Sequence, residues 1–186
     1  MVSDTHIPDR VDCLHPHLIP RIKEIKPDRI LHAGDISHQS VLEELTQIAR
    51  VLAVRGNRDW GWNPPLPMEE TLEINGNLLI LLHGHGGWGH YLFDKIDHTL
   101  RGYRLDRYKK YLTSRFPQAH GYIFGHSHFP EKNRLDGRIY FNPGSACLGG
   151  RWDLLSSFGV LKISAQGEIE AEIKPLDGYT ILNKSW

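Results

Sequence analysis

The sequence has few cysteines, no excess of either charge and no long apolar run, and each of these absences excludes a class of protein. Cys13 and Cys147 are too few for a disulfide framework and lack zinc-ribbon spacing, so we interpret them as free thiols in a reducing compartment. The 22 basic and 22 acidic side chains cancel, so there is no strong signal for binding nucleic acid or an anionic membrane. No apolar run reaches the roughly 20 residues that span a bilayer, and no signal-peptide pattern precedes the first motif. We therefore expect a cytoplasmic protein.

The apolar content is sufficient for one folded domain. Apolar residues make up 40% of the 186 residues, and the chain contains no internal repeat, low-complexity tract or linker. A chain of this length can bury a substantial core, so we predict a single domain over residues 1–186. The sequence leaves the oligomeric state open and is compatible with a homo-oligomer.

Strand-like runs alternate with helical runs. Ser40 and Glu43 have the spacing of a helix capping box, and Asn75-Gly76 and Asp136-Gly137 are typical of tight hairpin turns. This order predicts two packed sheets flanked by helices. Helices are expected at about 14–26, 40–50 and 91–116, and strands at 29–33, 51–54, 72–74, 78–82, 122–124, 158–163 and 169–173.

The first strand is unusually short. Only Met1 and Val2 precede the polar residues Ser3 and Asp4, whereas a buried central strand usually has about five or six residues. Either the natural start lies upstream of Met1, or the fold tolerates a short first strand. The sequence does not decide between these two interpretations.

Polar clusters follow the predicted strands at the points where those strands end. In open α/β sheets, binding sites lie at the carboxyl ends of the strands, so we expect these clusters to meet. Each cluster is weak evidence alone, since 12 histidines make a chance His-x-His common, but together they indicate a site for two metal ions. The clusters are Asp4-Thr5-His6, Gly34-Asp35, Gly56-Asn57-Arg58-Asp59, His83-Gly84-His85 and Gly125-His126-Ser127-His128.

In this order the clusters resemble the calcineurin-like metallophosphoesterase superfamily, specifically its small YfcE-type phosphodiesterase branch. The family pattern is D-x-H, G-D, G-N-[HC]-D, H and G-H-x-H, and the resemblance covers nearly the whole chain. It implies a four-layer αββα sandwich. It also implies that Asp4, His6, Asp35 and His128 hold one metal ion, that Asp35, Asn57, His83 and His126 hold a second, and that Asp59 orients a ligand or a neighbouring loop.

The expected chemistry is hydrolysis of a small phosphodiester by a hydroxide that bridges the two metals. One carboxylate can join two cations about 3.5–4 Å apart, and such a pair lowers the pKa of a bridging water and clamps the phosphoryl oxygens. No phosphoenzyme is then needed. Carboxylate, imidazole and amide ligands suit Mn, Fe, Co, Ni or Zn, and the resemblance favours manganese.

Arg58 departs from the family pattern. Relatives have a histidine or a cysteine here, and the histidine is thought to protonate the leaving oxygen. An arginine stays charged, so we expect Arg58 to bind a phosphate oxygen instead. Proton donation would then fall to another group, such as His85 or His38, or the enzyme would require good leaving groups. His85 is equally compatible with a purely structural role in its glycine-rich turn.

The segment of about residues 88–117 is longer than in relatives, and we expect a helical insert. It is rich in aromatic and basic residues, which is compatible with a lid that stacks a nucleobase, but an amphipathic helical pair is the favoured interpretation. Alternatives to the phosphodiesterase are a phosphomonoesterase, a nucleotide pyrophosphohydrolase, and a non-catalytic scaffold such as the retromer subunit of this fold. That subunit has lost part of its ligand set, whereas every ligand position is filled here.

Overall fold

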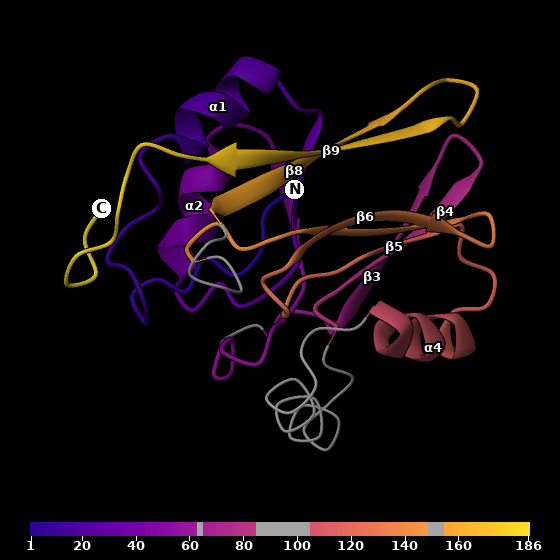
Figure 1. The fold of residues 1–186 in the computed structure, drawn as a ribbon, viewed down its shortest axis with the longest axis horizontal. Helices are drawn as coiled ribbons and strands as arrows, with labels where there is room; N and C mark the ends of the chain where they lie inside the picture. Colours follow the sequence, from indigo (N-terminus) through magenta and orange to yellow (C-terminus); the bar gives the residue numbers. More distant parts are fainter. Residues whose placement is uncertain (63–64, 85–104, 149–154) are drawn as a thin grey trace.

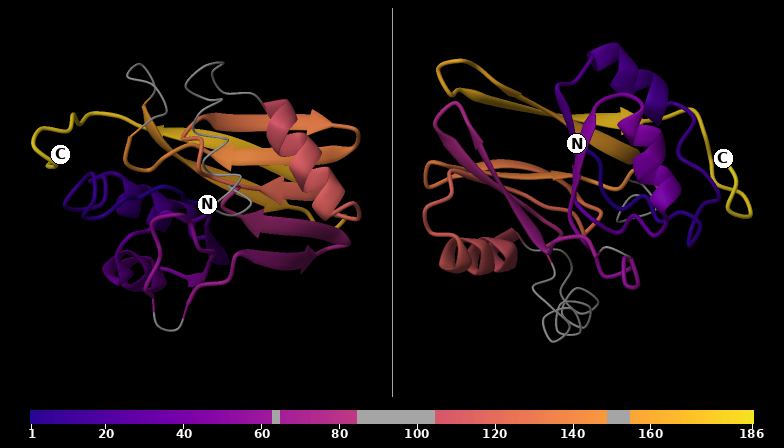
Figure 2. Two further views of the ribbon diagram at one scale, coloured as in Figure 1. Left: turned by 90° about the horizontal axis from the view of Figure 1, so that it is seen from below. Right: turned by 180° about the vertical axis from the view of Figure 1, so that it is seen from behind.

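Two layers of strands pack face to face, with helices on both outer faces, in the computed structural model of the chain (Figure 1). One layer is a five-stranded sheet, and the other consists of two two-stranded sheets that the N-terminal segment joins into one. The structure describes residues 1–62, 65–84, 105–148 and 155–186. Helices α1 (Leu18–Ile25) and α2 (Gln39–Thr46) cover one sheet, and α4 (Leu105–Arg115) covers the other. Figure 2 shows α4 on the side of the molecule away from the hairpin of β8 (Ser156–Ile163) and β9 (Ile169–Leu176). The four-layer αββα sandwich expected from the sequence is confirmed.

The first sheet is held together by the short N-terminal segment. Strand β1 (Arg29–His32) pairs in parallel with β2 (Arg50–Ala53), and β8 (Ser156–Ile163) pairs antiparallel with β9 (Ile169–Leu176). Val2 accepts the amide of Ala33 at 2.9 Å and donates its own amide to Leu31 at 2.8 Å. On its other side, Met1 accepts the amide of Gly159 at 2.9 Å. The first residues therefore act as a central strand between β1 and β8, despite their shortness.

The second sheet is mixed and has the order β3-β4-β5-β7-β6. Its strands are β3 (Glu69–Ile74), β4 (Asn77–Leu82), β5 (Gly121–Ile123), β6 (Pro130–Leu135) and β7 (Arg138–Pro143). β4, β5 and β7 are parallel, while β3 and β6 are joined to the sheet as antiparallel hairpins. The turn residues Asn75-Gly76 and Asp136-Gly137 all have positive φ, as a type I′ hairpin turn requires. Both hairpins were predicted from these dipeptides.

The apolar core follows the alternation of side chains along the strands. In β4, Leu79 and Leu81 point between the two sheets, whereas Ile80 and Leu82 point toward α4. A third cluster, which includes Leu18 and Leu45, lies between the first sheet and the helices α1 and α2. Three buried clusters therefore fill the three interfaces between the four layers.

Helix boundaries differ from the sequence-based expectation. The first helix begins at Leu18 rather than near residue 14, and α2 ends at Thr46 rather than near residue 50. The capping-box prediction is wrong: the N-cap of α2 is His38, whose Nδ1 accepts the amide of Ser40 at 3.2 Å. The hydroxyl of Ser40 lies against the same ring, so it is not available to cap the helix.

The predicted helical insert lies mostly outside the described residues. Only its last part is described, as α4, and the aromatic and basic residues at 88–104 lie outside the description. Cys13 is exposed, Cys147 is buried, and both are free thiols. No helix of the described residues is long and apolar enough to cross a membrane. That residues 1–186 form one domain stays a prediction.

Candidate metal centre

The strands deliver the expected side chains to one edge of the sandwich. Asp4 and His6 follow the N-terminal segment, Asp35 follows β1, and Asn57 follows β2, so the first sheet contributes these residues. The second sheet contributes His83 after β4, and His126 and His128 after β5. The structure thus brings together every residue that the resemblance implies as a ligand, through the contacts described next.

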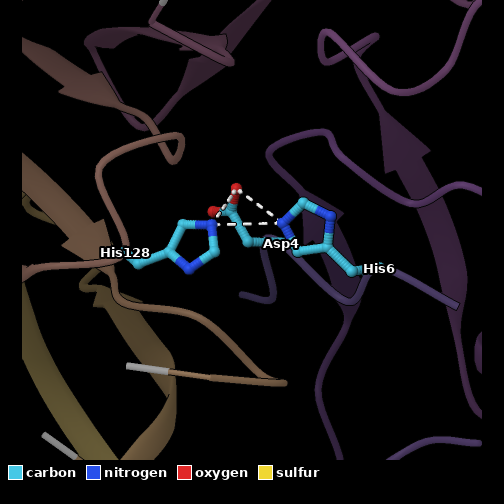
Figure 3. A group of neighbouring side chains, drawn as sticks. All are labelled: Asp4, His6 and His128. Carbon is cyan, nitrogen blue, oxygen red and sulfur yellow. Dashed lines mark hydrogen bonds and ion pairs between the residues drawn. The ribbon is translucent and has the colours of Figure 1, made fainter. Parts of the chain in front are cut away.

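Asp4, His6 and His128 form the first ligand group, with Asp4 between the two imidazoles (Figure 3). Asp4 Oδ1 lies 3.4 Å from His128 Nε2 and 3.8 Å from His6 Nε2. The two Nε2 atoms lie 3.1 Å apart. All three residues are buried, and their ligand atoms converge on one point.

A second ligand group lies beside the first. The ligand atoms of Asp35 and His83 lie within 4.8 Å of one another and of Asp4, and the side chains of Asn57 and His126 contact His83. His83 Nε2 lies 3.4 Å from Asp35 Oδ1 and 3.1 Å from Asn57 Oδ1. His126 Nδ1 lies 3.1 Å from the same Asn57 oxygen. The second oxygen of Asp35 lies 3.7 Å from His6 Nε2 in the first group. Asp35 therefore faces both groups, one oxygen toward each.

Backbone carbonyls fix which nitrogen of two histidines can bind a metal. His128 Nδ1 lies 2.9 Å from the carbonyl oxygen of Leu148, and His83 Nδ1 lies 2.7 Å from that of Ala33. A carbonyl can only accept a hydrogen bond, so in both rings the proton is on Nδ1. Nε2 is then the nitrogen that faces the site and would bind a metal ion once it carries no proton, which is the usual arrangement of histidine ligands.

Charges within the site shift the pKa values of its members. Burial alone would raise the pKa of Asp4, but the positive charges of His128, His83 and His6 hold it below its usual range. Burial would likewise raise the pKa of Asp35, but the charge of His83 lowers it. Burial, the largest single influence, opposes charge on His83, but the charges of Asp35 and Asp4 and the hydrogen bonds to Asp35 and Ala33 together raise the pKa of His83 to about 9. The buried carboxylates thus stay ionised and need nearby positive charge.

A divalent cation fits this site. Asp4 Oδ1 is buried and accepts no hydrogen bond, which is costly for a carboxylate oxygen unless a cation lies beside it. The donors around it are carboxylate oxygens and imidazole nitrogens, with an amide oxygen in the second group, a set that suits Mn, Fe, Co, Ni or Zn.

The loops that carry the site have an unusual backbone. Positive φ is costly for residues other than glycine, and such residues cluster at functional sites. A Cβ atom on Gly56 would lie 2.2 Å from both the amide nitrogen and Oδ1 of Asp35, so only glycine allows this approach of the two loops. Five candidate ligands have this costly positive φ, with values between 51° and 68°: Asp4, His6, Asp35, His126 and His128.

Asp59 ties two of these loops together. Its Oδ1 accepts the amides of Ile36 and Ser37 at 2.9 and 2.8 Å, and its Oδ2 accepts the amide of Gly56 at 2.7 Å. Burial raises the pKa of Asp59, and these backbone hydrogen bonds oppose that rise. The carboxylate therefore fixes the loop of Asp35 against the loop of Asn57 without touching the ligand atoms.

The two residues expected to act on substrate are less well defined. The amide of Arg58 donates to Asp35 Oδ1 at 2.9 Å, and its side chain is exposed. His85 lies outside the described residues. Arg58 is therefore at the mouth of the site, and its role toward phosphate stays a prediction.

Two residues near the site escaped the sequence-based analysis. The side-chain amide of Asn142 donates to the carbonyl of Gly125 at 2.9 Å and to the hydroxyl of Ser127 at 3.0 Å, which supports the loop of His126 and His128. Arg10 lies beside His128, with Nη1 3.4 Å from Nδ1 of that ring. Neither contact has a local sequence signal, since both join distant parts of the chain.

An αββα sandwich with carboxylates, imidazoles and an amide on the loops between its sheets has the architecture of a metal-dependent phosphoesterase. A family model, the calcineurin-like phosphoesterase superfamily domain, matches residues 1–166. The chain belongs to that superfamily.

Relatives agree with this assignment. A protein of Methanothermobacter thermautotrophicus named "Probable metallophosphoesterase" is 30% identical over 174 residues, which cover 93% of this chain and 89% of the relative. Wild-type Vps29 of Entamoeba histolytica, solved in complex with zinc, aligns with a TM-score of 0.69 and 21% identity over 95% of this chain and 97% of its own. An archaeal phosphodiesterase aligns with a TM-score of 0.56 and 20% identity over 93% of this chain and 97% of its own. The two structural matches show a shared fold.

Proposed function

We propose that this protein is a phosphodiesterase that hydrolyses a small phosphate diester with the help of two divalent metal ions. The observation that carries the proposal is the position of Asp35, whose two oxygens face two separate ligand groups. A carboxylate so placed suits a bridge between two cations. The name of the archaeal phosphodiesterase of the same fold supports a diester substrate.

The residues divide between the two ions as follows. Asp4, His6, Asp35 and His128 would hold one, and Asp35, Asn57, His83 and His126 would hold the other, with manganese favoured over iron, nickel, cobalt or zinc. When bound, such a pair of ions supplies a hydroxide nucleophile near neutral pH and neutralises the phosphoryl oxygens.

The protein's own residues prepare the site for this chemistry. Leu148 and Ala33 hold the tautomers of His128 and His83, and Asp59 holds the loops of Asp35 and Asn57 in place. Arg58 would bind a phosphate oxygen at the mouth of the site. Because a guanidinium cannot act as a proton donor near neutral pH, we expect faster hydrolysis of substrates with good leaving groups.

Neither proposed alternative donor has support as a general acid from the described residues. His38 is exposed, and its Nδ1 accepts the amide of Ser40 at the start of α2. His85 lies outside the described residues. The natural substrate is a small phosphate ester, with a nucleotide as one candidate, and a cytoplasmic location stays a prediction.

A non-catalytic scaffold is the second candidate function. It is favoured by the likeness to Vps29, whose TM-score exceeds that of the archaeal phosphodiesterase. The complete ligand set and the unsatisfied buried oxygen of Asp4 favour an enzyme instead. A phosphomonoesterase or a nucleotide pyrophosphohydrolase would use the same residues, so only the substrate distinguishes these activities.

The test compares hydrolysis of bis-p-nitrophenyl phosphate and p-nitrophenyl phosphate, with added manganese and then with chelator. We expect cleavage of the diester that requires metal, is faster than cleavage of the monoester, and falls at least 100-fold in Asp35→Asn, because a buried ligand shared by both ions is lost. Asp28→Asn is the matched control, since Asp28 is exposed and lies before β1. Faster monoester cleavage would favour the phosphomonoesterase, and no activity with any divalent metal would favour the scaffold.

A further inference from the structure

Arg10 projects over the metal centre from the loop that follows His6. Its amide donates to the carbonyl of His6 at 2.9 Å, which closes a turn and brings the side chain back toward the ligand. The guanidinium Nη1 then lies 3.4 Å from Nδ1 of His128. This nitrogen is on the part of the ring away from Nε2, which faces Asp4 and His6. Arg10 is therefore beside the first ligand group and not within it.

At 3.4 Å, the contact between Arg10 and His128 is long for a hydrogen bond. Nδ1 of His128 carries the proton that it donates to Leu148, so it has no lone pair for the guanidinium. Over residues 1–62, 65–84, 105–148 and 155–186, no carboxylate lies within ion-pair distance of Arg10, and its side chain makes no other hydrogen bond. The five N–H donors of the guanidinium are thus left for a group outside the described protein.

The charge of Arg10 requires an explanation. Its guanidinium lies beside His128, whose Nε2 faces His6 and Asp4 in the first ligand group. Divalent cations in the centre would add more positive charge nearby. An exposed guanidinium in such a place favours an anion, and its planar fork matches two oxygens of a phosphate.

We propose that Arg10 binds a second anionic group of the substrate, a phosphate separated from the one that reacts. This inference rests on the proposed function, and it narrows the substrate class to phosphate esters that carry a further phosphate. Arg58 follows Asn57 in the second ligand group, whereas Arg10 lies beside His128 in the first. On this proposal Arg58 would bind the reacting phosphate and Arg10 the second one.

The experiment measures binding of adenosine 3′,5′-bisphosphate and adenosine 5′-monophosphate to the manganese-loaded protein by isothermal titration calorimetry. We expect the bisphosphate to bind about tenfold more tightly, the gain from one charge-assisted pair of hydrogen bonds. In Arg10→Met this preference disappears, because the Kd of the bisphosphate rises about tenfold while that of the monophosphate changes less than threefold. Arg10→Lys keeps the charge without the fork and should retain part of the preference.

Controls separate this role from the other roles available to Arg10. Arg29→Met replaces an exposed arginine at the end of β1 that is farther from the metal centre, so the preference for the bisphosphate should remain intact. A loss of manganese affinity in Arg10→Met would mean that Arg10 positions His128, and equal weakening of both nucleotides would mean that it binds the reacting phosphate. Either result, or the absence of a preference in the wild type, overturns the inference. Hydrolysis of the diester without a preference for the bisphosphate would contradict this inference alone. A preference for the bisphosphate without hydrolysis of the diester would contradict only the catalytic proposal.

Discussion

At the scale of single residues, Asp59 occupies a place that requires both oxygens of a carboxylate. It accepts three backbone amides, from Ile36, Ser37 and Gly56. In Asp59→Asn, one oxygen becomes an NH₂ group, so at least one of these buried amides loses its acceptor. We expect a loss of about 1–3 kcal/mol in the free energy of unfolding, measured by urea denaturation.

The same substitution should weaken metal binding, although Asp59 touches no ligand atom. The loop of Asp35 and the loop of Asn57 would no longer be held together, and loss of such outer contacts typically costs about 10- to 100-fold in metal affinity. Asp9→Asn is the matched control, since Asp9 is exposed and, among the described residues, its side chain accepts a hydrogen bond only from the hydroxyl of Ser37. Unchanged manganese affinity in Asp59→Asn would show that the backbone alone holds these loops.

At the scale of elements, the C-terminal segment packs against the loop between His6 and α1. Trp186 donates its indole N–H to the carbonyl of Cys13 at 2.8 Å, and its ring lies 4.5 Å from that of His15. Tyr179 packs against His15 at 5.4 Å. His15 is thus buried among aromatic rings that belong to the far end of the chain.

This packing makes the protein less stable in acid. Burial lowers the pKa of His15 to about 4, so the unfolded chain binds a proton below pH 6.5 while the folded protein does not. Stability is therefore lost as the pH falls from about 6.5 toward 4. In His15→Asn, we expect a smaller drop in Tm between pH 7 and pH 5 than in the wild type, by differential scanning calorimetry.

His38→Asn is a closely matched control for this experiment. Nδ1 of each histidine accepts an amide two residues on, that of His17 for His15 and that of Ser40 for His38, and asparagine can accept in the same way. His38 is exposed, so its replacement should leave the acid-induced drop in Tm unchanged. If His15→Asn kept the full drop, other groups would dominate the acid sensitivity.

The elements also show which features of the fold and the site could be predicted from the sequence alone. The strand ends were predictable because apolar runs stop at Gly34-Asp35, Gly56-Asn57 and His83, and parallel strands bring such ends together. The position of Arg10 beside the site could not be predicted, because its neighbour His128 lies 118 residues away in the sequence. The capping box failed for a local reason, since a histidine side chain took the place that the pattern assigns to serine or threonine.

At the scale of the whole molecule, the metal centre joins the two sheets. The first sheet supplies Asp4, His6, Asp35 and Asn57, and the second supplies His83, His126 and His128. A bound ion would therefore link two layers that otherwise meet through apolar packing and hydrogen bonds such as those from Ser3 to Gly144 and from His126 to Asp4. Because these ligands come together only in the folded chain, metal should bind the native state and stabilise it.

Manganese should consequently raise Tm, and chelator should lower it again. At a free concentration 100 times Kd, one site adds about 2.7 kcal/mol, which corresponds to a rise of roughly 5–10 °C for a chain of this size. Scanning calorimetry of the wild type, Asp28→Asn and Asp35→Asn would measure this. We expect the first two proteins to shift alike and Asp35→Asn to shift little, because its loss removes a ligand from both groups. Titration calorimetry would first establish that the wild type binds manganese. Equal Tm values with and without manganese would then mean that the ion binds the unfolded chain as tightly as the folded one. The packing of the two sheets would in that case not be stabilised by the ion.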